Sequence, residues 1–356
     1  MNRVEEILKK ALDGGRVEEA EAAELFTAKD ILFLGNAASR LAAKKRQGKV
    51  ATYIVDRNVN YTNICVTDCT FCAFYRKKTD ADSYVLPFEI IAEKIEETLA
   101  LGGRQILLQG GHNIELKIEY FEDLFGKIKE RFDIHLHALS PPEIVHTGKI
   151  SRISVLETLK RLRAAGLDSI PGGGGEILVD RVRQKISPSK CTAAQWLEVM
   201  ELAHGMGIPT TATMMYGHVE TLRERVEHLT RLRQLQDKTG GFTAFIPWTF
   251  QPGNNPLGME RNGYKVTGLE YLKTLAISRI VLDNFDNIQS SWVTQGPKIG
   301  QMALYYGAND MGSIMIEENV VRGAGTSFSM TEDEIRRLIA DGGFIPRRRN
   351  MRYEYV

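Results

Sequence analysis

The sequence contains few cysteines, no long apolar run and no excess of either charge. Its 356 residues include four cysteines, 46 lysines and arginines, and 45 aspartates and glutamates, which leave a formal charge of +1. Four cysteines are too few to stabilise a chain of this length by disulfides. The balanced charge gives no reason to expect nucleic acid or an anionic membrane as a partner. No apolar stretch approaches the roughly eighteen residues that a membrane-spanning helix needs.

The remaining composition indicates a folded protein with a small-molecule partner. Apolar residues make up 43% and charged residues 26% of the chain, which is near the average of globular proteins and excludes disorder and fibrous structure. Residues 2–6 are mostly charged and lack the apolar stretch of a secretion signal. We therefore expect a cytoplasmic protein that binds neither nucleic acid nor a membrane.

Short β-prone runs alternate with longer helical runs from about residue 51 onward, which is typical of βαβ units and a parallel sheet. Eight such units over roughly 270 residues match a closed (β/α)8 TIM-type barrel. An open doubly wound sheet is the alternative, but no glycine fingerprint follows the first strand candidate. The strand candidates are residues 51–55 with a continuation through 64, 105–109, 134–139, 169–171, 210–216, 243–248, 288–293 and 313–316. The helix candidates between them include 87–101, 155–165, 192–204, 221–237 and 269–282.

The chain divides into a barrel with helical additions at both ends. Apolar residues at helical spacing in residues 1–50 predict an N-terminal helical cap. Residues 51–330 are expected to form the barrel, with its chemistry at the carboxyl ends of the strands. Residues 331–356 are expected to form a C-terminal helix and tail packed on the barrel. The arginine run at 347–349 is interpreted as a solvated part of that tail, given the balanced charge elsewhere.

Three of the four cysteines, Cys65, Cys69 and Cys72, lie at spacings of four and three residues. Thiolates at this spacing can surround one inorganic centre. A zinc site would need a distant fourth ligand such as Cys191 or a histidine, because structural zinc is four-coordinate. A redox dithiol at Cys69 and Cys72 would leave Cys65 without a role. A four-iron cluster held by three thiolates would keep one iron open for catalysis, and Cys191 would then be a buried or capping-region thiol.

The segment at 60–76, here called the cysteine loop, resembles the signature of the radical S-adenosylmethionine superfamily. It has the pattern Cys-x3-Cys-x2-Cys with the aromatic residue Phe71 before the last cysteine. The resemblance implies a 4Fe-4S cluster on Cys65, Cys69 and Cys72 whose open iron binds S-adenosylmethionine. It also implies an external one-electron reductant such as flavodoxin or ferredoxin. In such enzymes the cofactor performs the difficult chemistry and the protein controls the radical.

Two glycine-rich turns would then lie beside the cofactor. Gln109, Gly110 and Gly111 occupy the place where the superfamily contacts the methionine amino group, although the acidic residue often found there is missing. A tight βα turn that requires glycine is the other interpretation. After the fourth strand candidate, the resemblance implies that Glu176 accepts a ribose hydroxyl and that Arg183 pairs with the methionine carboxylate. A solvated arginine on a helix is the alternative for Arg183.

Several segments resemble one narrow group, the futalosine-pathway enzymes of menaquinone biosynthesis and the deazaflavin-forming synthases. They include residues 58–65, 137–143, 169–173 and 213–220. The segment at 246–253 is similar to the form found in the cyclic dehypoxanthinyl futalosine synthase family. That resemblance implies hydrogen abstraction from C4′ of a ribose and radical addition to a benzoate ring. An aminofutalosine synthase, and a non-catalytic iron–sulfur or zinc protein, are the alternative functions.

This chemistry needs a base near the ring, flat walls around the arene and an anchor for the carboxylate. Candidate residues of each kind lie near the expected strand ends, although histidines and aromatic residues there often serve only packing. The residues assigned to catalysis are His218, Glu220 and His137, with His112 and Glu143 as further proton-transfer candidates. The residues assigned to the arene walls are Trp248, Phe250 and Trp292. The possible carboxylate anchors are Arg57, Arg76 and Arg322, because a guanidinium matches that group.

Overall fold

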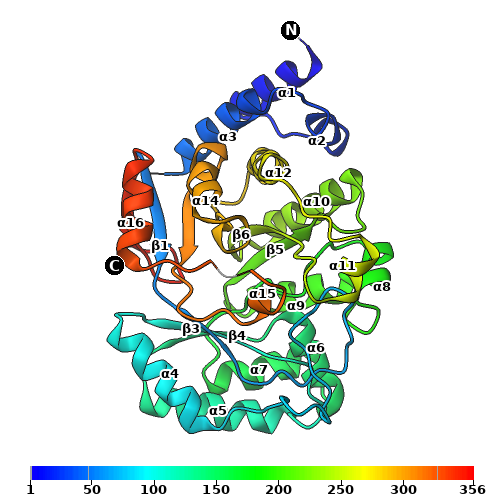
Figure 1. Ribbon diagram of the computed structural model, residues 1–356, viewed down its shortest axis with the longest axis vertical. Helices are drawn as coiled ribbons and strands as arrows, with labels where there is room; N and C mark the ends of the chain where they lie inside the picture. The colour runs from blue at the N-terminus through cyan, green and yellow to red at the C-terminus, as the bar shows by residue number, and fades with distance from the viewer. Residues whose placement is uncertain (1, 47, 327) are drawn as a thin grey trace.

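Three helices, α1 (Arg3–Leu12), α2 (Glu19–Leu25) and α3 (Ile31–Lys45), precede the first strand in the computed structural model, which describes residues 2–46, 48–326 and 328–356. The backbone N–H of Phe33 donates to the Asp30 carboxylate at 3.0 Å and fixes the start of α3. Thr27 donates to the carbonyl of Glu24. Figure 1 shows these helices together at one end of the molecule.

The helices that follow agree with the predicted periodicity, and their caps explain where they begin and end. Residues 155–165 form a helix with the predicted bounds, and Gly166 ends it in the left-handed conformation with φ of 119°. No helix in the described ranges is both long and apolar enough to cross a membrane. These helices are α4 (Phe88–Ala100), α5 (Ile118–Arg131), α6 (Pro141–Ser151), α7 (Val155–Ala165), α8 (Asp180–Ile186), α9 (Ala193–Gly205), α10 (Leu222–Thr239), α11 (Pro256–Glu260), α12 (Gly268–Val281), α13 (Trp292–Gln295), α14 (Pro297–Ala303), α15 (Val320–Gly323) and α16 (Glu332–Asp341), with a 3₁₀ turn at Leu304–Tyr306.

The strands match the predicted ones closely in the middle of the chain and less well toward its end. The candidate at 169–171 forms only single bridges, and the one at 288–293 shortens to two residues before a short helix. The candidate at 313–316 lies three residues earlier. The strands are β1 (Val50–Ile54), β2 (Arg57–Asn60), β3 (Gln105–Gln109), β4 (His135–Ala138), β5 (Thr210–Tyr216), β6 (Phe242–Thr249), β7 (Asn287–Ile288), β8 (Asp310–Ser313) and β9 (Ile345–Arg348).

Parallel pairings connect the strands in a continuous order. β1 pairs with β8 and β9, while β2, which follows β1 after two residues, pairs with β3, and β3 pairs with β4. Bridges from His137 to Ser169 and from Ile170 to Thr210 connect β4 to β5. β5, β6 and β7 pair in sequence, and one further bridge, between residues 289 and 310, leads back to β8. The result is a TIM-type α/β fold with helices arranged around the strands (Figure 1).

The C-terminal segment contains one further strand, and the interpretation of the arginine run at 347–349 as solvated was wrong for Arg349. β9 adds to the edge of β1 with Val50 opposite Ile345. Arg349, which follows β9, is 3% exposed, and its Nε lies 2.6 Å from the Asp310 carboxylate. The tail therefore inserts an ion pair between the strands. The sequence pattern hides this strand because a proline and two arginines occupy it, and proline is tolerated only in an edge strand.

Candidate functional site

The cysteine loop follows β2, and its hydrogen bonds place donors at the thiols. Thr67 Oγ1 lies 2.9 Å from Cys65 Sγ and 3.7 Å from Cys69 Sγ. The backbone N–H of His112 donates to Cys65 Sγ at 3.3 Å, and the N–H of Cys72 donates to the Cys69 carbonyl at 3.1 Å. The His112 N–H is directed at the Cys65 sulfur and stabilises its thiolate form, which suits an anionic ligand of a metal centre, whereas the Cys69 thiol is itself the donor to Thr67.

The three thiols fit an iron–sulfur cluster better than a single metal ion. Within the described part of the chain, no three ligating side chains lie close enough together to hold one ion. Thiolates that ligate different irons of a cluster are held apart by the cluster itself. Burial raises the pKa of Cys69 to about 11 and also raises the pKa of Cys72, so ionisation calls for a bound electrophilic centre. Cys65, Cys69 and Cys72 are the residues that could hold such a cluster.

The glycine turn after β3 packs directly against the cysteine loop. A Cβ atom at Gly111 would lie 2.2 Å from the carbonyl oxygen of Ile64, so only glycine permits this approach. The N–H of Gly110 donates to Glu143 Oε1 at 2.9 Å, while the other oxygen of Glu143 caps α6. Burial raises the pKa of Glu143, but these donors oppose the shift, and the carboxylate is engaged by the fold. Gln109, at the end of β3, lines a cavity between the strands that is described below.

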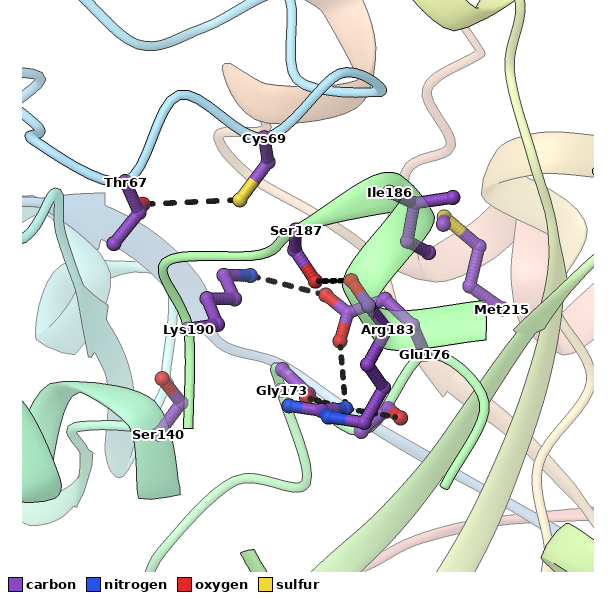
Figure 2. Close-up of polar contacts among 12 residues, drawn as sticks. Thr67, Cys69, Ser140, Gly173, Glu176, Arg183, Ile186, Ser187, Lys190 and Met215 are labelled. Atoms are coloured by element: carbon purple, nitrogen blue, oxygen red, sulfur yellow. Dashed lines mark hydrogen bonds and ion pairs between the residues drawn. The ribbon is translucent and has the colours of Figure 1, made fainter. Parts of the chain in front are cut away.

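A buried ammonium, missed by the sequence analysis, links the cysteine loop to the second glycine turn. Lys190 Nζ lies 3.0 Å from Glu176 Oε1 and 5.2 Å from the centre of the Phe71 ring. Burial lowers the pKa of Lys190, but Cys69 and Glu176 outweigh this effect and raise it, so the side chain is charged. Figure 2 shows Lys190 and Glu176 pointing toward each other below the loop that carries Cys69. Lys190, Glu176 and Arg183 together are called the Lys190 cluster.

Arg183 holds the glycine turn in place, and its 3% exposure excludes the solvated alternative. Its Nη1 donates to the carbonyls of Gly174 and Gly175, each at 3.0 Å. Its Nε and Nη2 donate to the carbonyl of Cys191 at 3.0 Å and 2.6 Å. Arg183 Nη1 is 3.6 Å from Glu176 Oε2, which is beyond hydrogen-bond distance, and this buried oxygen has no hydrogen-bond partner among the described residues. Glu176 lines the cavity and could accept a hydroxyl there.

A cavity of about 290 Å³ lies between the strands, and its lining includes three of the residues predicted for catalysis or arene binding, His137, Trp248 and Trp292. His137 Nδ1 is 2.7 Å from Ser169 Oγ, and burial lowers the pKa of His137 well below its usual value, so the imidazole is neutral. Trp292 Nε1 donates to the carbonyl of Ser313 at 3.1 Å, which fixes the ring in the wall. His137, a candidate base, and the aromatic rings of Trp248 and Trp292 therefore line the same cavity.

The pair His218 and Glu220 is placed in the loop after β5 rather than in the cavity lining. His218 Nε2 donates to a main-chain carbonyl at 2.9 Å, and its Nδ1 accepts the N–H of Val219 at 2.8 Å. Burial raises the pKa of Glu220, but His218 and Arg225 outweigh it and lower that pKa. Phe250 lies against His218, with ring centres 6.2 Å apart. These side chains hold one another, so their assigned roles in catalysis and arene binding stay predictions.

The three arginines suggested as carboxylate anchors also lie outside the cavity lining. Arg57 Nη1 is 2.6 Å from Glu97, and Arg76 Nε is 2.8 Å from Asp82. Arg322 belongs to the short helix α15. Two of the three therefore already have carboxylate partners within the chain.

Four polar residues that the sequence analysis missed line the cavity, and they are called the acceptor wall: Asp56, Asn58, Gln105 and Glu318. Asp56 lies between β1 and β2, Asn58 on β2 and Gln105 on β3. Burial raises the pKa of Asp56 and of Glu318. Asn58 belongs to a segment that carried the family resemblance, but nothing in that segment indicated a role for this particular residue. The other three carried no signal in a single sequence.

Two family descriptions match the chain in adjacent stretches, "Radical SAM superfamily" at residues 59–232 and "CofH/MqnC C-terminal region" at residues 239–356. A cyclic dehypoxanthine futalosine synthase of Halalkalibacterium halodurans is 46% identical over 99% of this chain and 95% of its own. A 5-amino-6-(D-ribitylamino)uracil–L-tyrosine 4-hydroxyphenyl transferase of Methanosarcina barkeri is 45% identical over 87% of this chain and 83% of its own. The crystal structure of methylornithine synthase covers 96% of this chain and 97% of that one, with a TM-score of 0.73 and 17% identity.

Together the TIM-type fold and the three thiols beside its cavity define an iron–sulfur enzyme. The chain belongs to the radical S-adenosylmethionine superfamily, within the group that shares the CofH/MqnC C-terminal region. Members of this superfamily use a 4Fe-4S cluster and S-adenosylmethionine. The resemblance found in the cysteine loop is therefore confirmed.

Proposed function

We propose that this chain is a cyclic dehypoxanthine futalosine synthase of menaquinone biosynthesis. The observation that carries the proposal is the 46% identity to such a synthase across nearly the full length of both chains. The segment at 246–253, which resembles that family's form, contributes Ile246 and Trp248 to the cavity lining. The substrate is a small molecule, and a cavity between the strands suits it.

The reaction requires loss of the C4′ hydrogen from the ribose, bond formation between C4′ and the benzoate ring, and removal of one electron and one proton. When bound, the reduced cluster and S-adenosylmethionine supply a 5′-deoxyadenosyl radical. The protein must hold the C4′ hydrogen within reach and exclude other hydrogens. A rigid cavity wall performs this task because it restricts the substrate to one orientation.

We assign the cofactor side to residues around the cysteine loop. Cys65, Cys69 and Cys72 hold the cluster, with Phe71 and Lys190 packed beside them. The backbone of Gly110 and Gly111 and the side chain of Gln109 face the methionine end. Glu176 accepts a ribose hydroxyl of S-adenosylmethionine through its unpaired oxygen, and Arg183 fixes the turn that carries it. We assign Lys190, and not Arg183, as the cation that binds the methionine carboxylate, because the Arg183 guanidinium already donates to main-chain carbonyls.

We assign the substrate side to the cavity lining. His137 accepts the proton released on rearomatisation, since it is neutral and its Nε2 remains after Ser169 occupies Nδ1. Trp248 and Trp292 bracket the arene. His218, Glu220 and Phe250 shape the loop after β5, and through it the cavity entrance, without touching the reacting atoms.

The architecture and the setting complete the proposal. The pairings from β2 to β8 and back to β1, which β2 continues, support our assignment of a closed (β/α)8 barrel to residues 51–330, with a helical cap at 1–50 and a packed C-terminal helix and strand at 331–356. An external one-electron donor such as flavodoxin or ferredoxin reduces the cluster. The enzyme works in the cytoplasm, because a low-potential cluster and free thiols persist in a reducing compartment.

The test is an anaerobic assay of reduced, reconstituted protein with S-adenosylmethionine and dehypoxanthine futalosine deuterated at C4′. We expect deuterium in 5′-deoxyadenosine and one equivalent of a product lighter by one deuterium and one hydrogen. A cyclised product with unlabelled 5′-deoxyadenosine would contradict the C4′ assignment. Absence of a cyclised product would contradict the function.

Two related activities are distinguished in the same assay. An aminofutalosine synthase would incorporate the adenosyl group into its product from an enolpyruvyl benzoate. A 4-hydroxyphenyl transferase would consume tyrosine when supplied with 5-amino-6-(D-ribitylamino)uracil. Turnover with either substrate mixture, and none with dehypoxanthine futalosine, would replace the proposed function by that activity.

A further inference from the structure

The acceptor wall contains two amide–carboxylate pairs of the same design. Asn58 Nδ2 donates to Glu318 Oε2 at 3.1 Å. Gln105 Nε2 donates to Asp56 Oδ2 at 2.5 Å. All four residues line the cavity, and the two amides come from the paired strands β2 and β3. Each carboxylate is therefore held by an amide that stands beside it in the wall.

This pairing fixes which way each amide points. In both pairs the amide nitrogen donates to the carboxyl oxygen, so the amide oxygen faces away from that carboxyl group. Asn58 is 5% exposed and Gln105 is 4% exposed. Their oxygens, Asn58 Oδ1 and Gln105 Oε1, are buried and have no hydrogen-bond partner in the described structure. The orientation of Asn58 has independent support, because the other oxygen of Glu318 accepts the N–H groups of Val320 and Val321, so Glu318 acts as an acceptor.

Unpaired buried oxygens at a ligand cavity indicate what the ligand supplies. A buried acceptor without a donor destabilises the folded protein, and a native fold keeps few of them. Here the two residues that carry such oxygens, Asn58 and Gln105, lie on neighbouring strands in the lining of one cavity. A ligand with two neighbouring hydroxyl donors would satisfy both at once. The adjacent carboxylates of Asp56 and Glu318 would repel a ligand carboxylate, so the anionic part of a ligand belongs elsewhere.

We propose that Asn58 and Gln105 are specificity residues that accept hydrogen bonds from the sugar hydroxyls of the substrate. The inference rests on the proposed function, because dehypoxanthine futalosine carries a ribose without its base and a benzoate carboxylate. The ribose lies against the acceptor wall and the benzoate points away from it. This orientation places the sugar carbons, C4′ among them, at a fixed depth in the cavity.

The test combines substrate analogues with protein variants in a double-mutant cycle. The probes are dehypoxanthine futalosine and its 2′-deoxy and 3′-deoxy analogues, and the variants are Asn58→Leu and Gln105→Met. With the wild type, kcat/KM should fall about tenfold or more for at least one deoxy analogue, as expected when a buried acceptor loses its donor. In the variant that lacks the matching oxygen, the parent substrate should lose a similar factor, and the deoxy analogue should lose nothing further.

Asn284→Leu is the matched control. Asn284 Nδ2 also donates to a carboxylate, Asp237 at 2.8 Å, and its Oδ1 is also unpaired, but it lies outside the cavity lining. This variant should keep the wild-type difference between parent and deoxy substrates. Substrate-free cleavage of S-adenosylmethionine should stay unchanged in all three variants, which separates a lost contact from misfolding.

Two results would overturn the inference while the proposed function stands. One is a wild type that processes both deoxy analogues as well as the parent, and this needs no variant to fold. The other is additive losses in the cycle for both Asn58→Leu and Gln105→Met. By contrast, a wild type that cleaves S-adenosylmethionine but does not cyclise dehypoxanthine futalosine counts against the proposed function itself.

Discussion

The two sides of the candidate site differ in how their polar groups are satisfied. On the cofactor side, the chain's own groups pair with one another: Glu143 holds the Gly110 turn and Arg183 binds three main-chain carbonyls. On the substrate side, Asn58 and Gln105 each leave an oxygen without a partner. The difference teaches that the fold satisfies most of the cofactor side by itself, where Glu176 Oε2 is the unpaired acceptor, and leaves two amide oxygens on the other side for a ligand to satisfy.

The largest expected effect is the loss of the thiol ligands. Replacing Cys65, Cys69 or Cys72 by alanine should reduce cleavage of S-adenosylmethionine to background, because a cluster missing one ligand is not held in place. Iron content and the electron paramagnetic resonance signal of the reduced protein measure the cluster directly. Cys191→Ala is the control and should retain both. A triple variant that still cleaves S-adenosylmethionine would show that the three cysteines do not hold the cluster.

The next effect tests whether the Lys190 cluster acts on the cofactor or only on the fold. Lys190→Met removes the cation 3.0 Å from Glu176 and leaves a buried carboxylate with one distant partner. We expect the Kd for S-adenosylmethionine to rise about tenfold to a hundredfold, which corresponds to about 1.4 to 2.8 kcal/mol. Lys190→Arg should restore part of the affinity. Unchanged affinity in Lys190→Met, with lower thermal stability only, would assign this lysine to the fold alone.

An effect on stability, with binding of the cofactor left intact, is expected beneath the acceptor wall, where Arg349 pairs with Asp310. Asp310→Asn should lower the free energy of unfolding by about 3–5 kcal/mol, because it leaves a buried guanidinium without its charge partner. The exposed pair of Lys127 and Asp123 is the control, and Asp123→Asn should cost about 0.5 kcal/mol or less. Denaturant titration measures both. Equal losses would mean that the C-terminal segment contributes no more than a surface contact.

The smallest effect is a pH dependence on the cofactor side. Leu178 N–H donates to His228 Nδ1 at 2.9 Å, and burial lowers the pKa of His228 to about 3. Because the unfolded residue takes up a proton near pH 6.5, the stability contributed by His228 is present above that pH and declines as the pH falls toward 3. His228→Asn keeps an acceptor and cannot titrate. The slope of unfolding free energy between pH 6 and 4 should fall by up to about 1.4 kcal/mol per pH unit. An unchanged slope would show that the histidine is already solvated in the folded state.

The sequence was sufficient for most of the fold because its strands are buried and regularly spaced. Residues 105–109 and 210–216 have the predicted bounds, since apolar runs flanked by glycine or proline mark buried parallel strands. β9 was not predicted, because a strand that contains a proline and two arginines follows no apolar pattern. Its stability comes from β1 and Asp310, which lie far away in the chain.

The candidate site was predictable only where spacing itself carries the chemistry. The cysteine spacing identified the cofactor side, and the glycines of the turns marked close contacts such as that of Gly111 with Ile64. Lys190 and Gln105 could not be found, because their significance depends on burial and on partners from other strands. His218 and Glu220 show the converse. Their motif indicated chemistry, whereas their contacts are with each other and with the surrounding loop.

The pairing of Val50 with Ile345 has a consequence for assembly. Nearly the whole polypeptide must be present and compact before β9 can dock, so the entropy of closing that long loop is paid late on the folding route. The cysteine loop, in contrast, contacts segments that precede β9 in the chain: the N–H of Thr70 donates to the Ile186 carbonyl, and the N–H of Leu257 donates to the Thr70 carbonyl. We therefore expect that iron–sulfur insertion can precede completion of the substrate pocket. A chain that ends before β9 would then hold its cluster but lack the part of the cavity lining that follows β9.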